Sequence, residues 1–126
     1  MFLLYGANGY TGKLAARTAV EDGLEPILGG RSAEKVRAVA EPLGLPWRTF
    51  DPADGDAARE ALGDVRAVLS MAGPFAHTAD AMVDACLASG THYLDITAEM
   101  DVFSGLQGRD HAAREAGVML LPGVGA

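Results

Sequence analysis

Three glycines spaced three apart near the N-terminus place the strongest constraint on how this chain can fold. The stretch LLYGANGYTGKLA (residues 3–15) sets Gly6, Gly9 and Gly12 between a short apolar run and a helix-like run. Glycine is costly inside regular structure, because it loses more conformational freedom on folding than other residues. The spacing therefore predicts a tight connection from a strand to a helix. Two explanations are open at this point: a plain turn, or a loop that lets phosphate groups approach the backbone.

Strand-like and helix-like segments alternate along the rest of the chain. Apolar runs typical of buried strands cover residues 1–5, 25–29, 47–50, 66–71, 92–96 and 118–121. Apolar residues recur at helical spacing within residues 12–21, 36–43, 58–62, 79–87 and, interrupted by glycines, 100–116. This alternation predicts an α/β protein of Rossmann type, a doubly wound parallel sheet of about six strands in the order 3-2-1-4-5-6.

Composition narrows the function classes. The 126 residues carry a net charge of −7 and one cysteine, Cys86, which we expect in the core. The excess of acids disfavours a nucleic-acid or anionic-membrane surface, and a single cysteine excludes an internal disulfide. The chain shows neither a signal-peptide pattern nor an apolar run long enough for a membrane span. We therefore expect one cytoplasmic domain, residues 1–126, that handles a small molecule.

The position of the glycines favours a ligand over a plain turn. Ligands of doubly wound sheets bind at the carboxyl ends of the strands, where this loop is predicted to lie. Gly6 permits the turn, Gly9 lets a pyrophosphate approach the backbone, and Gly12 allows close helix–strand packing. The same loop contains Ala7, Asn8, Tyr10 and Thr11. It lacks the Ser or Thr after lysine that a P-loop uses to hold magnesium, so we predict dinucleotide binding.

The residues after the second strand indicate which dinucleotide binds. An NAD site carries an acid about 20 residues after the glycines, and here that position is Arg31. A guanidinium suits a ribose 2′-phosphate, and Ser32 can add a hydroxyl or cap the next helix. We expect Gly29 and Gly30 to expose backbone beside them. NADP(H) is therefore predicted, the alternatives being a solvated Arg31 and an ordinary N-cap at Ser32.

Other strand ends supply further candidates. Asp51 follows the third strand and suits the adenine edge and the cap of a turn equally well. Small residues after the fourth strand leave room for the cofactor's ribose and nicotinamide, in the segment Ala72, Gly73, Pro74 and Phe75. Acids and a threonine after the fifth strand suit either the substrate side or the cap of the next helix: Asp95, Thr97 and Glu99. The histidines lack metal-ligand spacing, so we predict no metal and assign no catalytic residue.

Taken in order, GANGYTG, GGRS, LSMAGPF and ACLASGTHYLDIT with its following glutamate resemble the NADP-binding domain of the saccharopine dehydrogenase/reductase-like family, which includes trans-acting enoyl reductases. The resemblance covers nearly the whole chain, and the family's DxTGE reads DITAE here, with Ala98 in place of glycine. It implies NADPH-dependent hydride transfer to an imine or enoyl substrate, and a second domain after these residues.

The resemblance leads to two further expectations. These residues alone should bind cofactor without turnover, and the apolar patch left where a second domain packs should make them a homo-oligomer. The alternative is a non-catalytic NADP(H)-binding module that senses redox state and acts through a protein partner.

Overall fold

The computed structural model describes residues 1–71, 75–95, 113, 117 and 119–121, with the backbone only for 75–79 and 121. Six parallel strands form one sheet in the order β3-β2-β1-β4-β5-β6, which confirms the predicted topology. The strands are β1 (Phe2–Tyr5), β2 (Ile27–Gly30), β3 (Trp47–Thr49), β4 (Ala67–Ser70), β5 (His92–Asp95) and β6 (Leu120–Leu121). The described helices are α1 (Tyr10–Glu21), α2 (Ala33–Leu43), α3 (Gly55–Leu62) and α4 (Phe75–Ser89). The helix expected at 100–116 lies outside the described residues.

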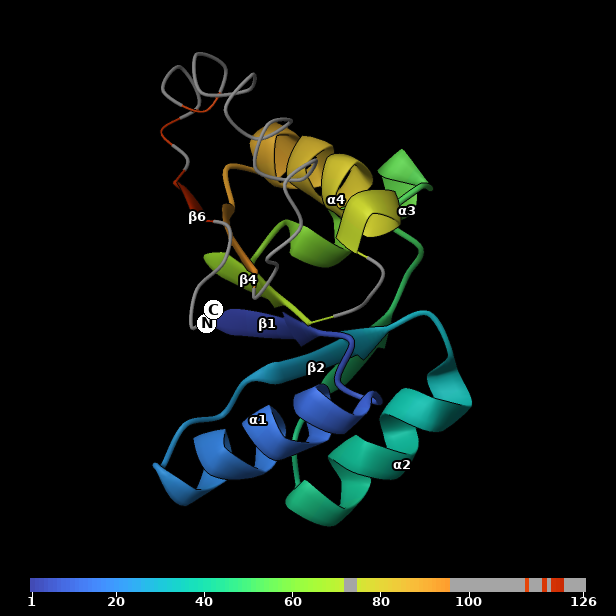
Figure 1. The fold of residues 1–126 in the computed structure, drawn as a ribbon, viewed down its shortest axis with the longest axis vertical. Helices are drawn as coiled ribbons and strands as arrows, with labels where there is room; N and C mark the ends of the chain where they lie inside the picture. Colours follow the sequence, from blue (N-terminus) through green and yellow to red (C-terminus); the bar gives the residue numbers. More distant parts are fainter. Residues whose placement is uncertain (72–74, 96–112, 114–116, 118, 122–126) are drawn as a thin grey trace.

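The sheet is covered on both faces, with α1 and α2 on one side and α3 and α4 on the other (Figure 1). Successive residues of the central strands therefore face opposite cores, as in other parallel sheets. Leu4 and Leu28 belong to the core under α1 and α2, which includes Ala16, Val36 and Ala40. Leu3 and Ile27 belong to the core under α3 and α4, which includes Val68, Leu62, Met82, Cys86 and Tyr93. Cys86 is thus a core residue, as expected.

The two glycines of β2, Gly29 and Gly30, leave space for neighbouring side chains to pack against the strand. Gly29 and Gly30 are both buried, so the expectation that they expose backbone is wrong for Gly29, whereas Gly30 lines a pocket at the end of β2 beside Arg31. A Cβ on Gly29 would lie 2.8 Å from Leu3 Cδ2, and one on Gly30 would lie 2.7 Å from Val36 Cγ2. Real Cβ atoms do not approach other atoms this closely. The missing side chains therefore let Leu3 and the helix α2 pack directly against this strand.

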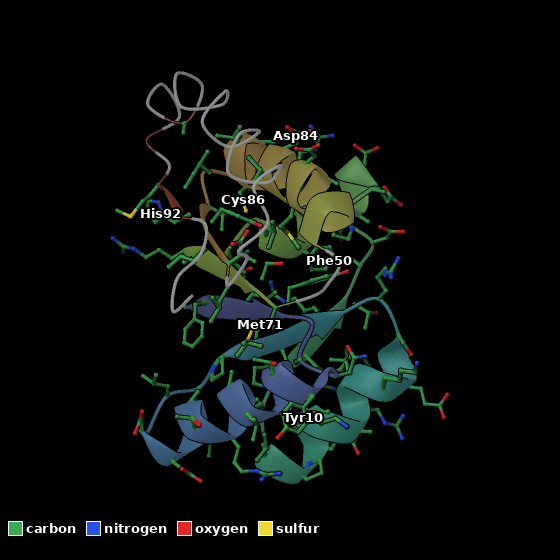
Figure 2. The ribbon with its side chains drawn as sticks, in the orientation of Figure 1. Tyr10, Phe50, Met71, Asp84, Cys86 and His92 are labelled. Carbon is green, nitrogen blue, oxygen red and sulfur yellow. The ribbon has the colours of Figure 1, made fainter. Side chains whose placement is uncertain are left out.

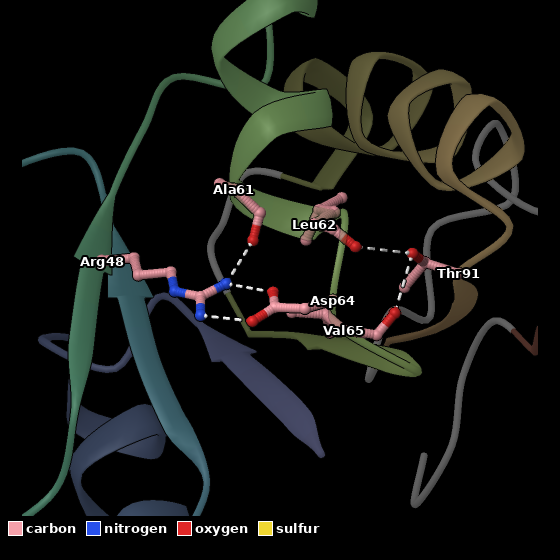
Figure 3. A network of polar contacts seen from close by, with 6 residues as sticks. All are labelled: Arg48, Ala61, Leu62, Asp64, Val65 and Thr91. Atoms are coloured by element: carbon pink, nitrogen blue, oxygen red, sulfur yellow. Dashed lines mark hydrogen bonds and ion pairs between the residues drawn. The ribbon is translucent and has the colours of Figure 1, made fainter.

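The turn between α3 and β4 is held from two sides (Figure 3). Arg48, on the edge strand β3, donates to both carboxylate oxygens of Asp64 at 2.6 and 2.8 Å and to the Ala61 carbonyl at 2.7 Å. This pairing lowers the pKa of Asp64 to about 2. On the other side, the buried Thr91 hydroxyl lies 3.3 and 3.1 Å from the Leu62 and Val65 carbonyls. The end of α3 is thereby fixed to both β3 and β5.

We expect Thr91→Val to destabilise the fold by about 1–3 kcal/mol, because it keeps the side-chain shape but removes the donor from a buried carbonyl. Thr18→Val, on the exposed surface of α1, is the matched control and should change stability by less than about 0.5 kcal/mol. Urea denaturation of both variants measures the difference. A Thr91→Val protein as stable as the parent would show that this hydroxyl does not hold the turn.

Candidate functional site

The loop after β1 is built by glycines at its two ends. Gly6 adopts a φ of +87°, a left-handed conformation that side chains disfavour. The Gly6 and Ala7 amides both donate to the Gly29 carbonyl, at 2.9 and 3.2 Å, which anchors the loop to β2. A Cβ on Gly12 would lie 2.2 Å from the Gly6 oxygen and 2.8 Å from the Ala7 Cα. The loop and the first turn of α1 therefore touch backbone to backbone.

Gly9 differs from its neighbours, because nothing in the fold requires glycine there. Its φ of −77° and ψ of 168° are open to any residue. A Cβ at this position would meet only the Gly6 oxygen, at 3.4 Å, which is an ordinary contact. Its missing side chain instead keeps the backbone at the start of α1 open to an approaching group.

Hydrogen-bond donors are available at that point. The first N–H groups of any helix lack partners within the helix. Ser32 caps α2 and Asp54 caps α3 through side-chain oxygens, whereas the Gly9 cap of α1 offers no side chain. The first turn of α1 also contains no acid. Its N–H groups and the positive end of the helix dipole are therefore available to an anion such as a phosphate group.

A pocket of about 350 Å³ continues from the glycine loop across the ends of β1 and β2. Its lining includes Asn8, Gly9, Arg31, Ser32, Lys35 and Met71. The structure thus brings Arg31 and Ser32 beside the glycine loop, as the sequence predicted. Ser32 is also the N-cap of α2, where its Oγ accepts from the Lys35 amide at 3.4 Å.

Lys35 was not among the predicted site residues. It is the third residue of α2, and the Ser32 cap places this turn over the end of β2. The Ser32 cap was the available signal, because a capping oxygen accepts from the amide three residues on, which here is that of Lys35. Two cationic side chains and a hydroxyl therefore line one pocket, a donor set that suits a phosphate group.

Asp51 forms the turn that was one of its two predicted roles. Its Oδ1 accepts from the Ala53 amide at 2.9 Å, and its carbonyl accepts from the Asp54 amide. The adenine contact stays a prediction.

Tyr5 links this region to the loop glycines. Its hydroxyl donates to the Phe50 carbonyl at 2.9 Å, and the two rings pack with centroids 5.0 Å apart. Burial raises the pKa of Tyr5 to about 12, with the Arg31 charge opposing and the Asp51 charge adding to the rise. Tyr5 therefore stays protonated and continues to donate at neutral pH.

The strand β5 holds a buried polar pair at its carboxyl end. Asp95 is the last residue of β5, is fully buried and accepts from the Tyr93 hydroxyl, a partner that the sequence did not reveal. Burial and the Asp95 carboxylate both raise the pKa of Tyr93, so it remains a donor. The other candidates here, Ala72, Gly73, Pro74, Thr97 and Glu99, lie outside the described residues, as does the Phe75 side chain.

His92 and Cys86 have roles within the fold (Figure 2). His92 Nδ1 accepts from the Met119 amide at 2.9 Å, which ties β5 to the start of β6. Burial raises the pKa of Cys86 to about 12, so this thiol is unreactive at neutral pH. In the described part of the chain, no three His, Cys, Asp or Glu side chains gather as metal ligands would. No described helix is long and apolar enough to cross a membrane.

Comparison with known proteins adds sequence and fold relatives. Residues 2–121 match the family described as saccharopine dehydrogenase NADP binding domain. A trans-acting enoyl reductase of Mycobacterium leprae is 34% identical over 105 residues, covering 78% of this chain and 25% of the relative. A saccharopine dehydrogenase-like oxidoreductase of Arabidopsis thaliana is 28% identical, covering 98% of this chain and 31% of its own length. This chain therefore spans about a quarter to a third of these relatives.

Solved structures show the same fold. Saccharopine dehydrogenase (L-Glu forming) of Saccharomyces cerevisiae superposes with a TM-score of 0.83 at 20% identity, over 98% of this chain and 26% of that one. Triphenylmethane reductase of Citrobacter sp., solved in complex with NADP(H), gives a TM-score of 0.75 at 18% identity, over 97% of this chain and 48% of that one.

We expect Gly9→Val and Gly12→Ala to separate binding from folding. Gly9→Val should keep the parent's melting temperature within a few degrees and lose dinucleotide binding, because its side chain occupies the approach to the α1 amides. Gly12→Ala should destabilise the fold by about 1–3 kcal/mol or more, since the backbone clash outweighs the roughly 1 kcal/mol gained in helix propensity. Thermal unfolding and calorimetric titration measure the two effects. If the Gly9→Val protein folds and binds the dinucleotide with the affinity of the parent, the loop is a plain turn.

Proposed function

Because this chain belongs to the saccharopine dehydrogenase NADP-binding domain family, we propose that it binds NADP(H) as the cofactor half of an oxidoreductase acting on an imine or enoyl substrate. The membership makes it an NAD(P)-binding domain of the oxidoreductase class. The choice of NADP(H) and the reaction are our proposal. Gly9 is the observation that carries it, because its missing side chain has no role within the fold and leaves the uncapped start of α1 open.

The second support is the donor set beyond the loop. The pocket after β2 is lined by Arg31, Ser32 and Lys35, and no described acid occupies the place where an NAD site accepts from the ribose. Arg31 and Lys35 would hold the 2′-phosphate through charge-assisted hydrogen bonds, and Ser32 would add its hydroxyl. The three residues lie within five positions of one another around the cap of α2 and line the same pocket.

The reaction follows from what the cofactor supplies and what the chain arranges around it. When bound, the reduced nicotinamide delivers a hydride to the carbon of a C=N or C=C bond, whose nitrogen or α-carbon then takes a proton. The pyrophosphate cradle and the 2′-phosphate donors position one end of the cofactor. The opposite end would extend over the ends of β4 and β5, beside the buried Tyr93–Asp95 pair of β5.

We expect Arg31→Ala to weaken NADPH binding about 10- to 100-fold, the loss of one or more charge-assisted hydrogen bonds of about 1.5–3 kcal/mol each. Lys35→Ala should weaken NADPH binding about 5- to 10-fold, since a lysine contributes as a point charge. NADH binding should barely change in either variant. Arg37→Ala is the control, because Arg37 lies on α2 outside the pocket and pairs with Glu41. Calorimetry with both cofactors measures the difference, and equal losses for NADPH and NADH would contradict the 2′-phosphate assignment.

We also expect these 126 residues to bind NADPH without turning over an acceptor. Hydride transfer needs the acceptor held about 3–3.5 Å from the nicotinamide in aligned geometry. The matched relatives have most of their length outside the region that this chain covers. The assay mixes the protein with NADPH and either a cyclic imine or an enoyl thioester, and follows the absorbance of the reduced nicotinamide. Saturable oxidation that depends on one acceptor would overturn this expectation and identify the substrate class.

A further inference from the structure

A second pocket, larger than the one at the end of β2, lies between α1 and α2. It has a volume of about 630 Å³, within the range of small-molecule sites. Its apolar side is contributed by one helix, through Ala38, Val39, Pro42 and Leu43 of α2. Its polar side consists of Asn8 in the glycine loop and three cationic residues, Lys13, Arg17 and Lys35. The lining from α2 is therefore mostly apolar, with Lys35 as its cation, and α1 supplies the other two cations, Lys13 and Arg17.

The three cations have no counter-ion within the described chain. The described ion pairs join Arg37 to Glu41, Arg48 to Asp64 and Arg59 to Asp56, and none includes Lys13, Arg17 or Lys35. All three side chains are exposed, so the pocket presents their charges to solvent. Of the two acids on α2, Glu41 pairs with Arg37 outside the pocket, and Glu34 is in none of the described ion pairs.

The arrangement also works against the helices that carry it. Lys13 and Lys35 lie in the first turns of α1 and α2, where the helix dipole disfavours a positive charge by about 0.3–1 kcal/mol each. Lys13 and Arg17 are four residues apart on α1, a spacing at which like charges repel by about 0.2–0.5 kcal/mol. An anion held among them would reverse each of these terms. The charges of this pocket therefore destabilise the free protein, and a bound anion should stabilise it.

We propose that the α1–α2 pocket binds a second small molecule, an amphipathic anion with a phosphate or carboxylate head and an apolar body. The head lies among Lys13, Arg17 and Lys35, and the body lies along the apolar face of α2. This site is distinct from the cofactor cradle, although the two share Asn8 and Lys35. Because two anions would then share the Lys35 charge, each should weaken the binding of the other by a limited factor.

The test uses octyl phosphate as the probe, with octanol and inorganic phosphate as probes that have only the body or only the head. Calorimetry should show saturable 1:1 binding of octyl phosphate, and binding of each half-probe at least about 10-fold weaker. Arg17→Ala should weaken octyl phosphate binding at least about 5-fold and leave NADPH binding unchanged, since Arg17 does not line the cofactor pocket. Arg37→Ala removes the same charge outside the pocket and is the matched control. Ala38→Glu, which adds a negative charge to the exposed apolar wall, should have the effect of Arg17→Ala without removing a cation.

Three outcomes would overturn the proposal. The first is the absence of saturable octyl phosphate binding to a protein that binds NADPH, which leaves the proposed function intact. The second is binding that Arg17→Ala and Arg37→Ala weaken equally, which indicates general charge attraction. The third concerns the cofactor and rests on the proposed function. The apparent dissociation constant of octyl phosphate should reach a plateau as NADPH increases, whereas an unlimited rise would show that the pocket belongs to the cofactor site.

Discussion

The contact between the first turn of α1 and the loop after β1 is the constraint on which the rest of the site depends. A Cβ on Gly12 would come within 2.2 Å of the Gly6 oxygen, so the two backbones approach as closely as chemistry allows. This approach brings the start of α1 close to the end of β1. The two amide bonds to the Gly29 carbonyl then join the same loop to β2. The contact between Gly12 and Gly6 thereby brings the start of α1, the end of β1 and the pocket beyond β2 close together.

The sequence predicted the parts of the structure that depend on local chemistry and periodicity. The alternation of apolar runs predicted the strand order, and the positions of Gly6 and Gly12 predicted a turn and a close contact, both of which the structure confirms. The sequence did not predict that Gly29 and Gly30 are buried, because the residues that fill the space beside them come from other parts of the chain. Here those neighbours are Leu3 and Val36, which no local pattern identifies.

Residues whose role depends on distant partners were harder to predict. The hydrogen bond from Tyr93 to Asp95 joins residues two apart on one strand, whose side chains lie on the same face of the sheet. The sequence did not show that this acid is buried. The Thr91 hydroxyl donates to carbonyls 26 and 29 residues earlier in the chain, and the helix α4 lies between them in the sequence. The Ser32 cap gave the start of α2, but the sequence did not show that the Lys35 side chain lines the same pocket as Arg31. The charges of the α1–α2 pocket become visible only when two helices lie side by side.

The hydrogen bond from Tyr5 to the Phe50 carbonyl has a consequence for how a ligand is received. It reaches across β2 from the central strand to the edge strand's far end, two positions in the sheet away. Since Tyr5 keeps its proton over the whole neutral range, a change of pH within that range does not break this bond. The bond fixes the start of the segment after β3 in the structure without a ligand. A ligand there loses its own freedom but not that of the protein, so the entropic penalty of association is smaller than for a loop that must fold around its guest.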